Sequence, residues 1–578
     1  MSNISAPAPP SAARKRATSS SFVANAKVVA LLTFFSRVLG LVRESVAARC
    51  FGAGEVWSAF TFAFAIPNLF RRLLGEGALS AAFIPLYTQA VGREDVGGQN
   101  SDPRSIDSAN GFANASVNLL IVLLIALTFI GEAVLLAWAY CFQIDPETVL
   151  ALKLTAIMLP YVLLVCGQAF LSGILQVHHR FAAPAAVPIV SNILLIAAIV
   201  AAAEICDLHT HEGRVQGVYV LAISVLISGL FQLGWLIPSL LRTGFRFHPV
   251  MHFFTPQVRQ MLRLTGPVAL SAGVLQISTM ADKGITFFLS ASRTSMHFHF
   301  LGHLVRYPME AGALARLNWA QYLYQFPLSI FATAVATVIF PRLSASALSV
   351  DQTLFKHTIR RGIEATLFIG LPASIGLIVV AHPATALIFQ RGDFHPHDTE
   401  LVARSTMLYA AAIWAFSLQQ ILNRAYYAIH DTKTPLYWGI VNLLINTAVE
   451  VPLLWTGLSE SAMAAGTLVS FAVQSIAMVF MLNRRVGGIN LQQLAGPVVK
   501  MLIASAAMLA ACLAVQHLSF YPHHEGKIAW AEQLLILMTL GTAVYGIICH
   551  LLGMSVLEHV IPQRFRKAES RIDTNGRE

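Results

Sequence analysis

One run in the first quarter of the chain reads SVNLLIVLLIALTFIGEAVLLAWAY at 116–140, and Glu132 is its single charged residue. About twenty apolar residues in a helix are enough to cross the roughly 30 Å of hydrocarbon in a bilayer. Similar runs recur to the end of the chain. The whole chain is 56% hydrophobic and 12% charged, whereas soluble domains carry roughly 25% charged residues. The sequence therefore predicts a membrane protein that crosses the bilayer many times.

The apolar runs are expected to form about fourteen helices, which makes the fold class an all-α polytopic membrane protein. Backbone groups in lipid must find partners within their own segment, and a helix provides them. The alternating ten-residue pattern of a transmembrane β-barrel is absent from the sequence. The predicted helices cover approximately 24–48, 57–92 (kinked), 112–141, 148–176, 182–204, 215–241, 258–290, 312–346, 355–390, 398–429, 433–456, 460–484, 493–517 and 529–556.

Basic residues in the connections predict the orientation. With the N-terminus in the cytosol, 23 Lys and Arg fall on the cytosolic side and 6 on the other, as the positive-inside rule requires. Both termini are then cytosolic, and residues 1–25 and 557–578 form cytosolic tails. Residues 1–25 are rich in Ala, Ser and Pro, which predicts disorder rather than a removed signal peptide. Because the net charge of +10 is spread loop by loop, nucleic acid is not an expected partner.

Four arginines in the first two predicted spans are unusual, because a charge at mid-membrane is costly unless it faces a cavity or a partner. Arg37 and Arg43 lie six residues apart, so their faces differ by roughly 120° on a helix. Arg71 and Arg72 form a pair in the second span. Since guanidinium groups bridge phosphate in a bidentate way, the four predict a cavity for an anion. The alternative is an internal network with acidic neighbours, such as an Arg72–Glu76 pair.

The second span also carries the residues expected to bend it. Pro67 removes a helical hydrogen bond, and Gly75 and Gly77 weaken the helix after the arginine pair. We therefore expect a hinge beside the predicted anion site.

A cation site is the second hypothesis. Asp282 lies in the seventh predicted span, Asn442 and Asn446 lie one turn apart in the eleventh, and Thr467 lies in the twelfth. Their oxygens would suit a small cation such as Na⁺. The ordinary alternatives are an Asp282–Lys283 pair and polar bonds between helices.

Enzyme signals are missing from the sequence. It contains no Walker A, GxSxG or HExxH pattern and no firm metal-ligand spacing, so we expect a transporter rather than an enzyme. Three basic residues near span ends are expected to extend toward the bilayer surface: Lys153, Arg316 and Lys500. The long segment 291–311 is expected to be a solvated loop, with a lid as the alternative.

Several motifs in order resemble the MurJ (MviN) family of the multidrug/oligosaccharidyl-lipid/polysaccharide (MOP) exporter superfamily. The resemblance runs from the first helix to about the twelfth. The matching segments are SRVLGLVRES (36–45), FGAG (51–54), AFAIPNLFRRLLGEGALSAAFIP (63–85), GILQVHHRFAAPAAVPIVSN (173–192), TGPVALSAGVLQIS (265–278), LYQFPLSIFATAVATVIFPRLS (323–344), IFQRGDF (388–394) and YYAIHDTKTP (426–435).

The resemblance implies a lipid II flippase of peptidoglycan synthesis in the bacterial cytoplasmic (inner) membrane. It implies two six-helix lobes in a MOP/MATE-like V shape, here 26–241 and 258–484, plus two helices at 493–556 that form a groove for the lipid tail. The family's cavity arginines fall on Arg37, Arg43 and Arg71, with Ser36, Arg72 and Glu76 as neighbours. A monomer would move the undecaprenyl-diphosphate-linked substrate between leaflets by alternating access. No cofactor is expected, and the energy would come from a Na⁺ gradient, an H⁺ gradient or the membrane potential.

Two positions depart from the family pattern. Ser58 stands where the family usually has Asp, and Tyr322, preceded by Gln321, stands where it usually has Arg. Arg316, six residues earlier, is a candidate to compensate. These departures leave two alternatives open: a carrier of another polyprenyl-linked oligosaccharide, and a membrane scaffold that transports nothing.

Overall fold

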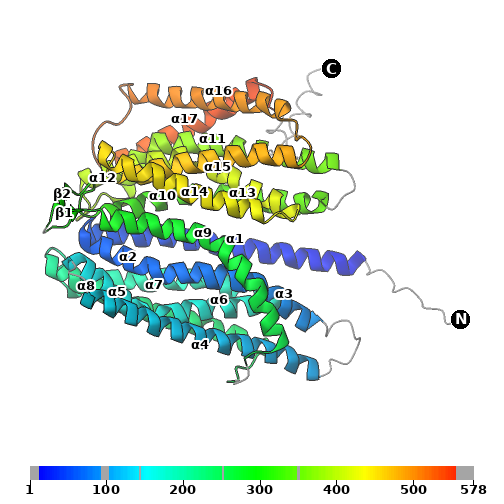
Figure 1. Ribbon diagram of the computed structural model, residues 1–578. Coiled ribbons are helices and arrows are strands. Elements are labelled where there is room, and N and C mark those ends of the chain that lie inside the picture. Colours follow the sequence, from blue (N-terminus) through cyan, green and yellow to red (C-terminus); the bar gives the residue numbers. More distant parts are fainter. Residues whose placement is uncertain are drawn as a thin grey trace, which may run out of the picture. The chain divides into compact units, whose positions relative to one another are not determined.

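The computed structural model describes residues 12–92, 103–141, 145–249, 253–293, 295–347 and 352–554, and these residues are mostly helical (Figure 1). The elements before residue 290 are α1 (Ala12–Phe51), α2 (Glu55–Phe70), a π-helix (Arg71–Ala78), α3 (Leu79–Gly92), α4 (Pro103–Cys141), α5 (Pro146–Met158), α6 (Tyr161–Val177), α7 (Ala182–Ile205), α8 (His211–Leu241) and α9 (Pro256–Phe288). The later ones are β1 (His297–Phe300), β2 (His303–Arg306), α10 (Ala313–Ala347), α11 (Gln352–Phe389), α12 (Pro396–Ala411), α13 (Ile413–Ala428), α14 (Lys433–Leu453), a 3₁₀ turn (Leu454–Thr456), α15 (Ser461–Arg485), α16 (Leu491–Gln516) and α17 (Lys527–Leu551).

The chain divides into two compact units. Unit 1 comprises Met1–Cys50 and Phe62–Gln276, and unit 2 comprises Phe51–Thr61 and Ile277–Glu578. Two helices therefore belong partly to each unit: α2 begins in unit 2 and ends in unit 1, and α9 does the reverse. The predicted lobes at 26–241 and 258–484 differ here, because they place residues 51–61 in the first lobe, whereas the structure groups these residues with unit 2.

Among the described residues, eight helices are long and apolar enough to cross a membrane, and the number rises to ten if each of two bent helix pairs is one span. The bent pairs are α5–α6 at 45° and α12–α13 at 41°. The chain is thus a multi-pass membrane protein. Four further long helical runs are not among these ten, namely α1, the α2–α3 run, α9 and α10. The same four runs carry Arg43, Arg71, Asp282 and Arg316.

Each bend has a local cause. Pro160 lies between α5 and α6, where a proline cannot donate to the preceding turn. Between α12 and α13 no proline is present, and the freed backbone N–H of Trp414 donates to Ser374 Oγ at 3.2 Å. In the second span the α-helix gives way to a π-helix at Arg71, four residues after Pro67.

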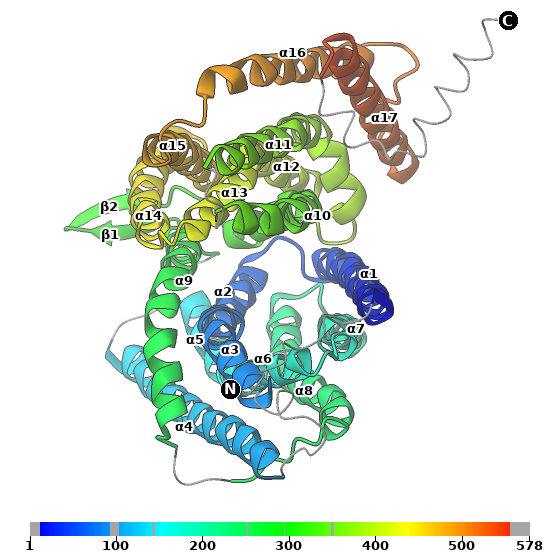
Figure 2. The same ribbon diagram turned by 90° about the vertical axis from the view of Figure 1, so that its right-hand side faces the viewer.

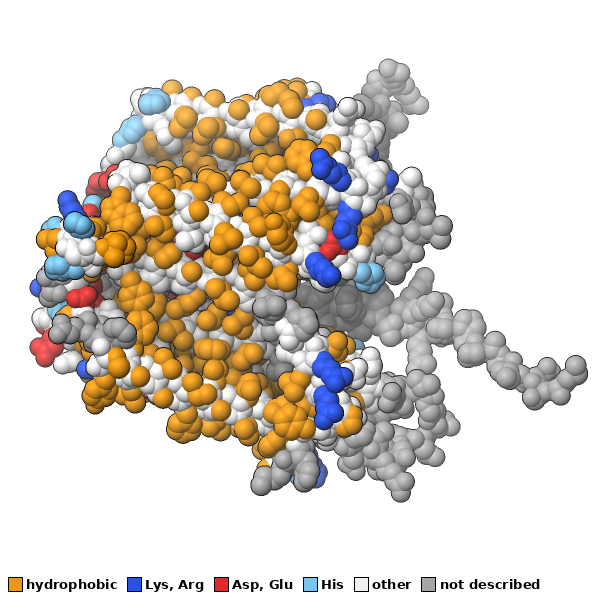
Figure 3. All heavy atoms as spheres, viewed as in Figure 1, with side chains coloured by type: hydrophobic (Ala, Val, Ile, Leu, Met, Phe, Trp, Pro, Cys, Tyr) orange, Lys and Arg blue, Asp and Glu red, His pale blue; other side chains and the backbone are white. Residues whose placement is uncertain are grey.

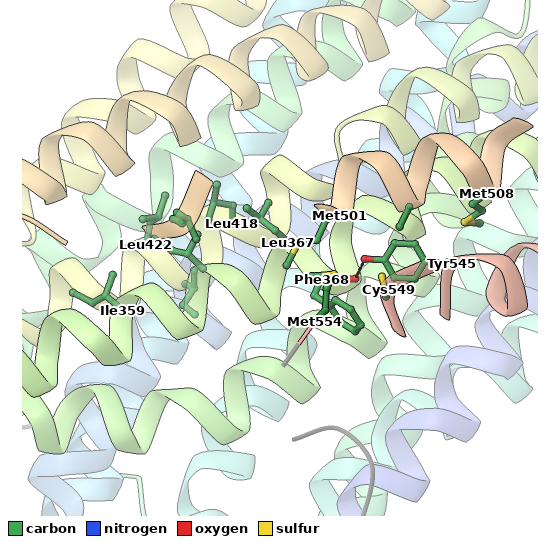
Figure 4. Close-up of a cluster of buried hydrophobic side chains, with 14 of the residues drawn as sticks. Ile359, Leu367, Phe368, Leu418, Leu422, Met501, Met508, Tyr545, Cys549 and Met554 are labelled. Atoms are coloured by element: carbon green, nitrogen blue, oxygen red, sulfur yellow. Dashed lines mark hydrogen bonds between the residues drawn. The ribbon is translucent and has the colours of Figure 1, made fainter. Parts of the chain in front are cut away.

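In unit 2, the last two helices pack together and against α11 (Figure 2). Their contact is a cluster of buried apolar side chains that includes Leu367, Met501 and Met508 (Figure 4). Inside it, Tyr545 of α17 donates its hydroxyl to the backbone carbonyl of Phe368 at 2.9 Å. This bond satisfies the only polar atom of the tyrosine side chain in an apolar setting.

Apolar side chains remain exposed along the helices, as expected for surfaces that face lipid. On the face in Figure 3, hydrophobic side chains cover the lengths of the helices, while Lys and Arg gather toward one end and His toward the other. On α4, Phe129, Ile130 and Leu136 are all more than half exposed.

Two expectations about the connections differ from the structure. Helix α1 already begins at Ala12, so 12–25 is helical rather than disordered; the AARKRA sequence has high helix propensity and extends a helix that the span has already nucleated. Segment 291–311 contains the β1–β2 hairpin instead of an irregular loop. The predicted tail at 557–578 lies outside the described residues, as do residues 1–11.

Candidate functional site

Arg43 on α1 is the best-held arginine of the predicted anion site. Its Nη2 and Nε donate to Glu44 Oε1 at 2.5 and 3.2 Å, and its Nη1 donates to Asn192 Oδ1 of α7 at 3.1 Å. Asn192 in turn donates to the backbone carbonyl of Ser36 at 3.1 Å. Ser36 therefore contributes its backbone, and the guanidinium plane is fixed from two sides.

The pair is not sealed from its surroundings. The Glu44 side chain is 5% exposed and the Arg43 side chain 16%. The carboxylate is thus buried behind the guanidinium, which is the more accessible charge. Charge-assisted bonds of this kind are strong and directional, so Glu44 orients Arg43 while partly neutralising it. The internal arginine–glutamate network left open by the sequence is present here, between Arg43 and Glu44.

Arg71 belongs to the same neighbourhood. Its side chain is half-buried, and both it and Arg43 act electrostatically on the hydroxyl of Tyr161. Tyr161 is buried at the start of α6 and accepts a hydrogen bond of 3.4 Å from Gln232. Of the four predicted arginines, Arg43 and Arg71 are half-buried, while Arg37 and Arg72 have exposed side chains.

The predicted hinge residues are only partly visible. Pro67 lies inside α2, and the π-helix contains Gly75, Glu76 and Gly77, whose surroundings lie outside the described side chains. At the α-to-π junction, the thiol of Cys166 lies 3.8 Å from the carbonyl oxygen of Phe70. Single-turn π segments occur frequently at functional sites, and this one starts on the arginine pair.

A second polar cluster lies in unit 2 and joins two carboxylates through one amide. Asn446 Nδ2 donates to Asp282 Oδ1 and to Glu450 Oε2, both at 2.9 Å. Asn446 and Glu450 on α14 are buried, and Asp282 on α9 is half-buried. Of the predicted cation site, Asp282 and Asn446 are in contact. Glu450 was missed, although it lies four residues after Asn446 and therefore on the same helix face.

The two remaining predicted ligands, Thr467 and Asn442, are buried on α15 and α14. Thr467 donates to the carbonyl of Met463 at 2.9 Å. Asn442 Nδ2 and Glu450 Oε1 are buried and make no hydrogen bond within the described residues. Unsatisfied buried polar atoms are rare and usually indicate a missing ion or water. Two carboxylates sharing one donor also repel each other unless a proton or cation lies between them.

A glycine allows α15 to come this close to the cluster. A Cβ on Gly466 would lie 2.9 Å from Glu450 Cβ and 3.0 Å from the Asn446 carbonyl oxygen. The described residues contain no group of three or more His, Cys, Asp or Glu that could hold a metal ion. The donors of this cluster are carboxylate, amide and hydroxyl oxygens, which suit hard cations.

The expectation for Arg316 was wrong. Rather than extending to the bilayer surface, Arg316 is 2% exposed. Its Nε donates to Glu460 Oε1 at 2.5 Å, and its Nη1 lies 3.7 Å from Asp398. A buried guanidinium requires such partners, and Glu460 is 144 residues away in sequence. Arg316 is thus committed to an ion cluster in unit 2.

The two positions predicted to depart from the family pattern lie in unit 2. Ser58 Oγ accepts a hydrogen bond of 3.1 Å from the backbone N–H of Ala315, one of the N–H groups that the first turn of α10 cannot satisfy itself. Gln321 donates to the hydroxyl of Tyr409 at 3.2 Å, and Tyr322 is half-buried. An uncharged side chain at each position therefore fits its surroundings.

Known proteins similar to this chain are membrane transporters. A family model described as lipid II flippase MurJ matches residues 47–530. A probable lipid II flippase MurJ from Vibrio cholerae is 30% identical over 433 residues, covering 74% of this chain and 77% of that protein. A lipid II flippase MurJ from Burkholderia cenocepacia is 30% identical over 434 residues, covering 73% and 77%.

Solved structures agree at the level of the fold. A lipid II flippase MurJ in an inward closed conformation has a TM-score of 0.71 and 22% identity, covering 92% of this chain and 99% of that one. An inward-facing MATE-family multidrug transporter of the MOP superfamily has a TM-score of 0.59 and 15% identity, covering 80% and 98%. The fold is therefore of the MOP type. Because the family model matches well over half of its length, the chain belongs to the lipid II flippase MurJ family.

Proposed function

We propose that this chain moves lipid II, the undecaprenyl-diphosphate-linked peptidoglycan precursor, from the cytoplasmic to the outer leaflet. The observation that carries the proposal is the match to the lipid II flippase MurJ family over residues 47–530. The held guanidinium of Arg43 supports it, because a diphosphate needs fixed cationic donors in a site with little water.

Arg43 and Arg71 are the residues proposed to bind the diphosphate. Both are half-buried in unit 1, and Asn192 and Glu44 fix the orientation of Arg43. Arg37 and Arg72 would add longer-range attraction from exposed positions on the same two spans. A bound diphosphate would compete with Glu44 for the Arg43 N–H groups. This competition would limit the affinity for the diphosphate, so that the lipid can be released as well as bound.

The Asp282–Asn446–Glu450 cluster is the proposed site of energy coupling. A Na⁺ ion or a proton bound there would relieve the repulsion of two carboxylates that share one amide. Moving one charge through a membrane potential of 100 mV supplies about 2.3 kcal/mol, which is enough to bias a carrier whose two states are close in free energy. Thr467 and Asn442 would complete the oxygen donors.

The finer topology belongs to the same proposal. Adding α1, the α2–α3 run, α9 and α10 to the ten apolar stretches gives fourteen spans, an even number that leaves both termini in the cytosol. The chain would work as a monomer by alternating access, with no catalytic step and no nucleic-acid partner. Pro67 and the π-helix would let the second span bend between states.

A carrier of another polyprenyl-linked oligosaccharide is the second candidate. Tyr322 and its neighbour Gln321 favour it, because a phenol at a position usually occupied by Arg, with an amide beside it, offers neutral hydrogen bonds that suit sugars. Both candidates need the diphosphate site, so a direct substrate assay has to distinguish them.

The test is the amount of lipid II exposed on the outer surface of cells that have lost their own flippase and express this chain. Arg43→Gln combined with Glu44→Gln removes the cation without leaving Glu44 buried and unpaired. Exposure should fall to the level of empty cells, while membrane insertion is unchanged. Lys153→Gln, an exposed basic residue on α5, is the matched control. No exposure by the unmodified, inserted chain would reject lipid II and turn attention to other polyprenyl-linked cargo.

A further inference from the structure

The β1–β2 hairpin joins α9 to α10 and has a rigid base. At the base, Ala291 N–H donates to the Met309 carbonyl at 2.8 Å, and Arg293 N–H donates to Glu55 Oε2 at 2.9 Å. The rings of Phe298 and Tyr307 pack with centroids 4.9 Å apart. The hairpin is therefore fixed on unit 2 and presents its tip in one place.

The tip has a turn that its sequence does not favour. Leu301 and Gly302 are its two central residues, with φ of +49° and +83°, which is the pattern of a type I′ turn. Glycine and asparagine adopt the left-handed region readily, whereas leucine is strained there. Leu301 is also 85% exposed. Backbone strain at a large, exposed apolar residue indicates that Leu301 contacts something other than the hairpin itself.

Other apolar side chains extend this exposed tip. Phe300 and Leu304 flank the turn and Met296 precedes β1, and each of the three is more than half exposed. Figure 2, which looks along the helices, shows the hairpin projecting sideways beyond α14. A hairpin that projects sideways at the end of the helices can reach the bilayer surface, and Trp455, half exposed after α14, is the kind of residue that lies at this surface.

The charge of the hairpin is of one sign. Its strands and turn, 297–306, contain Arg306 and three histidines but no Asp or Glu, whereas Arg293 and Glu310 lie at its base. In the antiparallel register His297 pairs with Arg306, and His299 pairs with Leu304, so these four side chains share one face. Guanidinium and imidazole N–H groups donate to phosphate oxygens.

We propose that the hairpin binds the bilayer surface, with Leu301 and Phe300 among the lipid headgroups and acyl boundary and with Arg306 and the histidines on anionic phospholipid phosphates. Amphipathic elements with cationic and apolar side chains bind membranes in this way. In the proposed topology this is the extracytoplasmic surface. The binding would fix the connection between α9, which carries Asp282, and α10, which carries Arg316.

The experiment places a nitroxide at the tip of the full-length chain reconstituted in vesicles. Leu301→Cys is labelled in a background in which Cys50 and Cys141 are replaced by Ser, because the other four cysteines are buried. Collisions with oxygen and with a water-soluble nickel chelate are then compared. His524→Cys, exposed on the α16–α17 connection, is the control site in water.

In vesicles of phosphatidylcholine with phosphatidylglycerol, the label at 301 should be shielded from the nickel chelate and open to oxygen, unlike the label at 524. Pure phosphatidylcholine should reduce this shielding, and Arg306→Gln should weaken the response to phosphatidylglycerol about fivefold. A label as accessible to the chelate as position 524 in every lipid overturns the proposal and leaves a protein partner as the occupant to seek. Equal shielding with and without phosphatidylglycerol rejects recognition of anionic lipid. Neither readout depends on transport of lipid II.

Discussion

The two polar clusters of the molecule use the same residue type with opposite polarity. In unit 1, the amide oxygen of Asn192 accepts from Arg43 while its nitrogen donates to a backbone carbonyl. In unit 2, the nitrogen of Asn446 donates to both Asp282 and Glu450. An asparagine thus presents its acceptor to a cation in one cluster and its donors to two anions in the other.

The two clusters differ in the charge that each leaves uncompensated. In the first cluster, Glu44 is the carboxylate hydrogen-bonded to Arg43. Around Asn446, the hydrogen bonds join two carboxylates, and Glu450 is fully buried. Because uncompensated charge is costly where water is scarce, the first cluster favours an anion and the second favours a cation.

The largest expected effect comes from removing one carboxylate of the second cluster. In Glu450→Gln the repulsion that favours a cation disappears, so Na⁺ should no longer stabilise the protein. A ligand at a hundred times its Kd stabilises a protein by about 2.7 kcal/mol. Thermal unfolding in NaCl against KCl measures the effect. If the unmodified chain shows no difference between the two salts, proton titration replaces Na⁺ as the explanation; an unchanged Na⁺ effect in the variant would refute the cation site.

Replacing the amide of Asn192 by a carboxylate should have the next largest effect, on lipid II exposure. Asn192→Asp places a second carboxylate on Arg43 and removes the donor to the Ser36 carbonyl. We expect lipid II exposure to fall about tenfold, since one charge-assisted interaction contributes about 1.5–3 kcal/mol. Asn192→Leu, which removes the bonds without adding charge, should retain more activity than Asn192→Asp. The opposite order would mean that shape, not charge, governs this cluster.

A smaller effect is expected at the glycine beside the second cluster. Gly466→Ala would force Glu450 and Asn446 away from α15, at a cost of about 1–3 kcal/mol. The free energy of unfolding measures it, together with the Na⁺ response. Gly546→Ala on α17 is the control, because no atom outside its own helix lies within 4 Å of the added methyl group. Equal losses in the two variants would show that the approach of α15 to α14 carries no special strain.

The smallest effect lies outside both clusters, at the turn before α14. Burial would raise the pKa of Asp431, but bonds from Thr434, Lys433 and Arg485 hold that pKa below its usual value. Its stabilisation is therefore complete above the unfolded pKa of about 3.9 and is lost as the pH falls through the lower folded value. Asp431→Asn should flatten this acid part of the stability curve in detergent and leave the neutral part nearly unchanged. An identical acid response in both proteins would contradict the assignment.

The cost of burying charge predicted part of these clusters from sequence alone. Arg43, Arg71 and Asp282 stood out because each is a charge inside an apolar run. Asn192, at the end of the VPIVSN segment, did not stand out. A single asparagine indicates no particular partner until the structure places α7 beside α1. Glu450 could have been predicted, because it lies four residues, about one helical turn, after Asn446.

The buried ion cluster of Arg316 could not be predicted from the sequence. The position of Arg316 near the end of a span fits a side chain that reaches toward water, and only the placement of Glu460 and Asp398 reveals a buried ion cluster. The π-helix also could not be predicted from the sequence. Pro67 and the glycines predicted a bend, but they did not predict that the helix would widen at Arg71 instead of breaking.

That widened segment has a geometric consequence. A π-helix closes each hydrogen bond one residue later than an α-helix, so Arg71–Ala78 contains more residues per turn than the helices on either side. If these eight residues were to wind into an α-helix with 3.6 residues per turn, α3 would rotate about its axis relative to α2. Such a rotation would turn the residues after Ala78 relative to Arg71 and Arg72 without breaking the span, so the second helix would act as a screw as well as the proposed hinge.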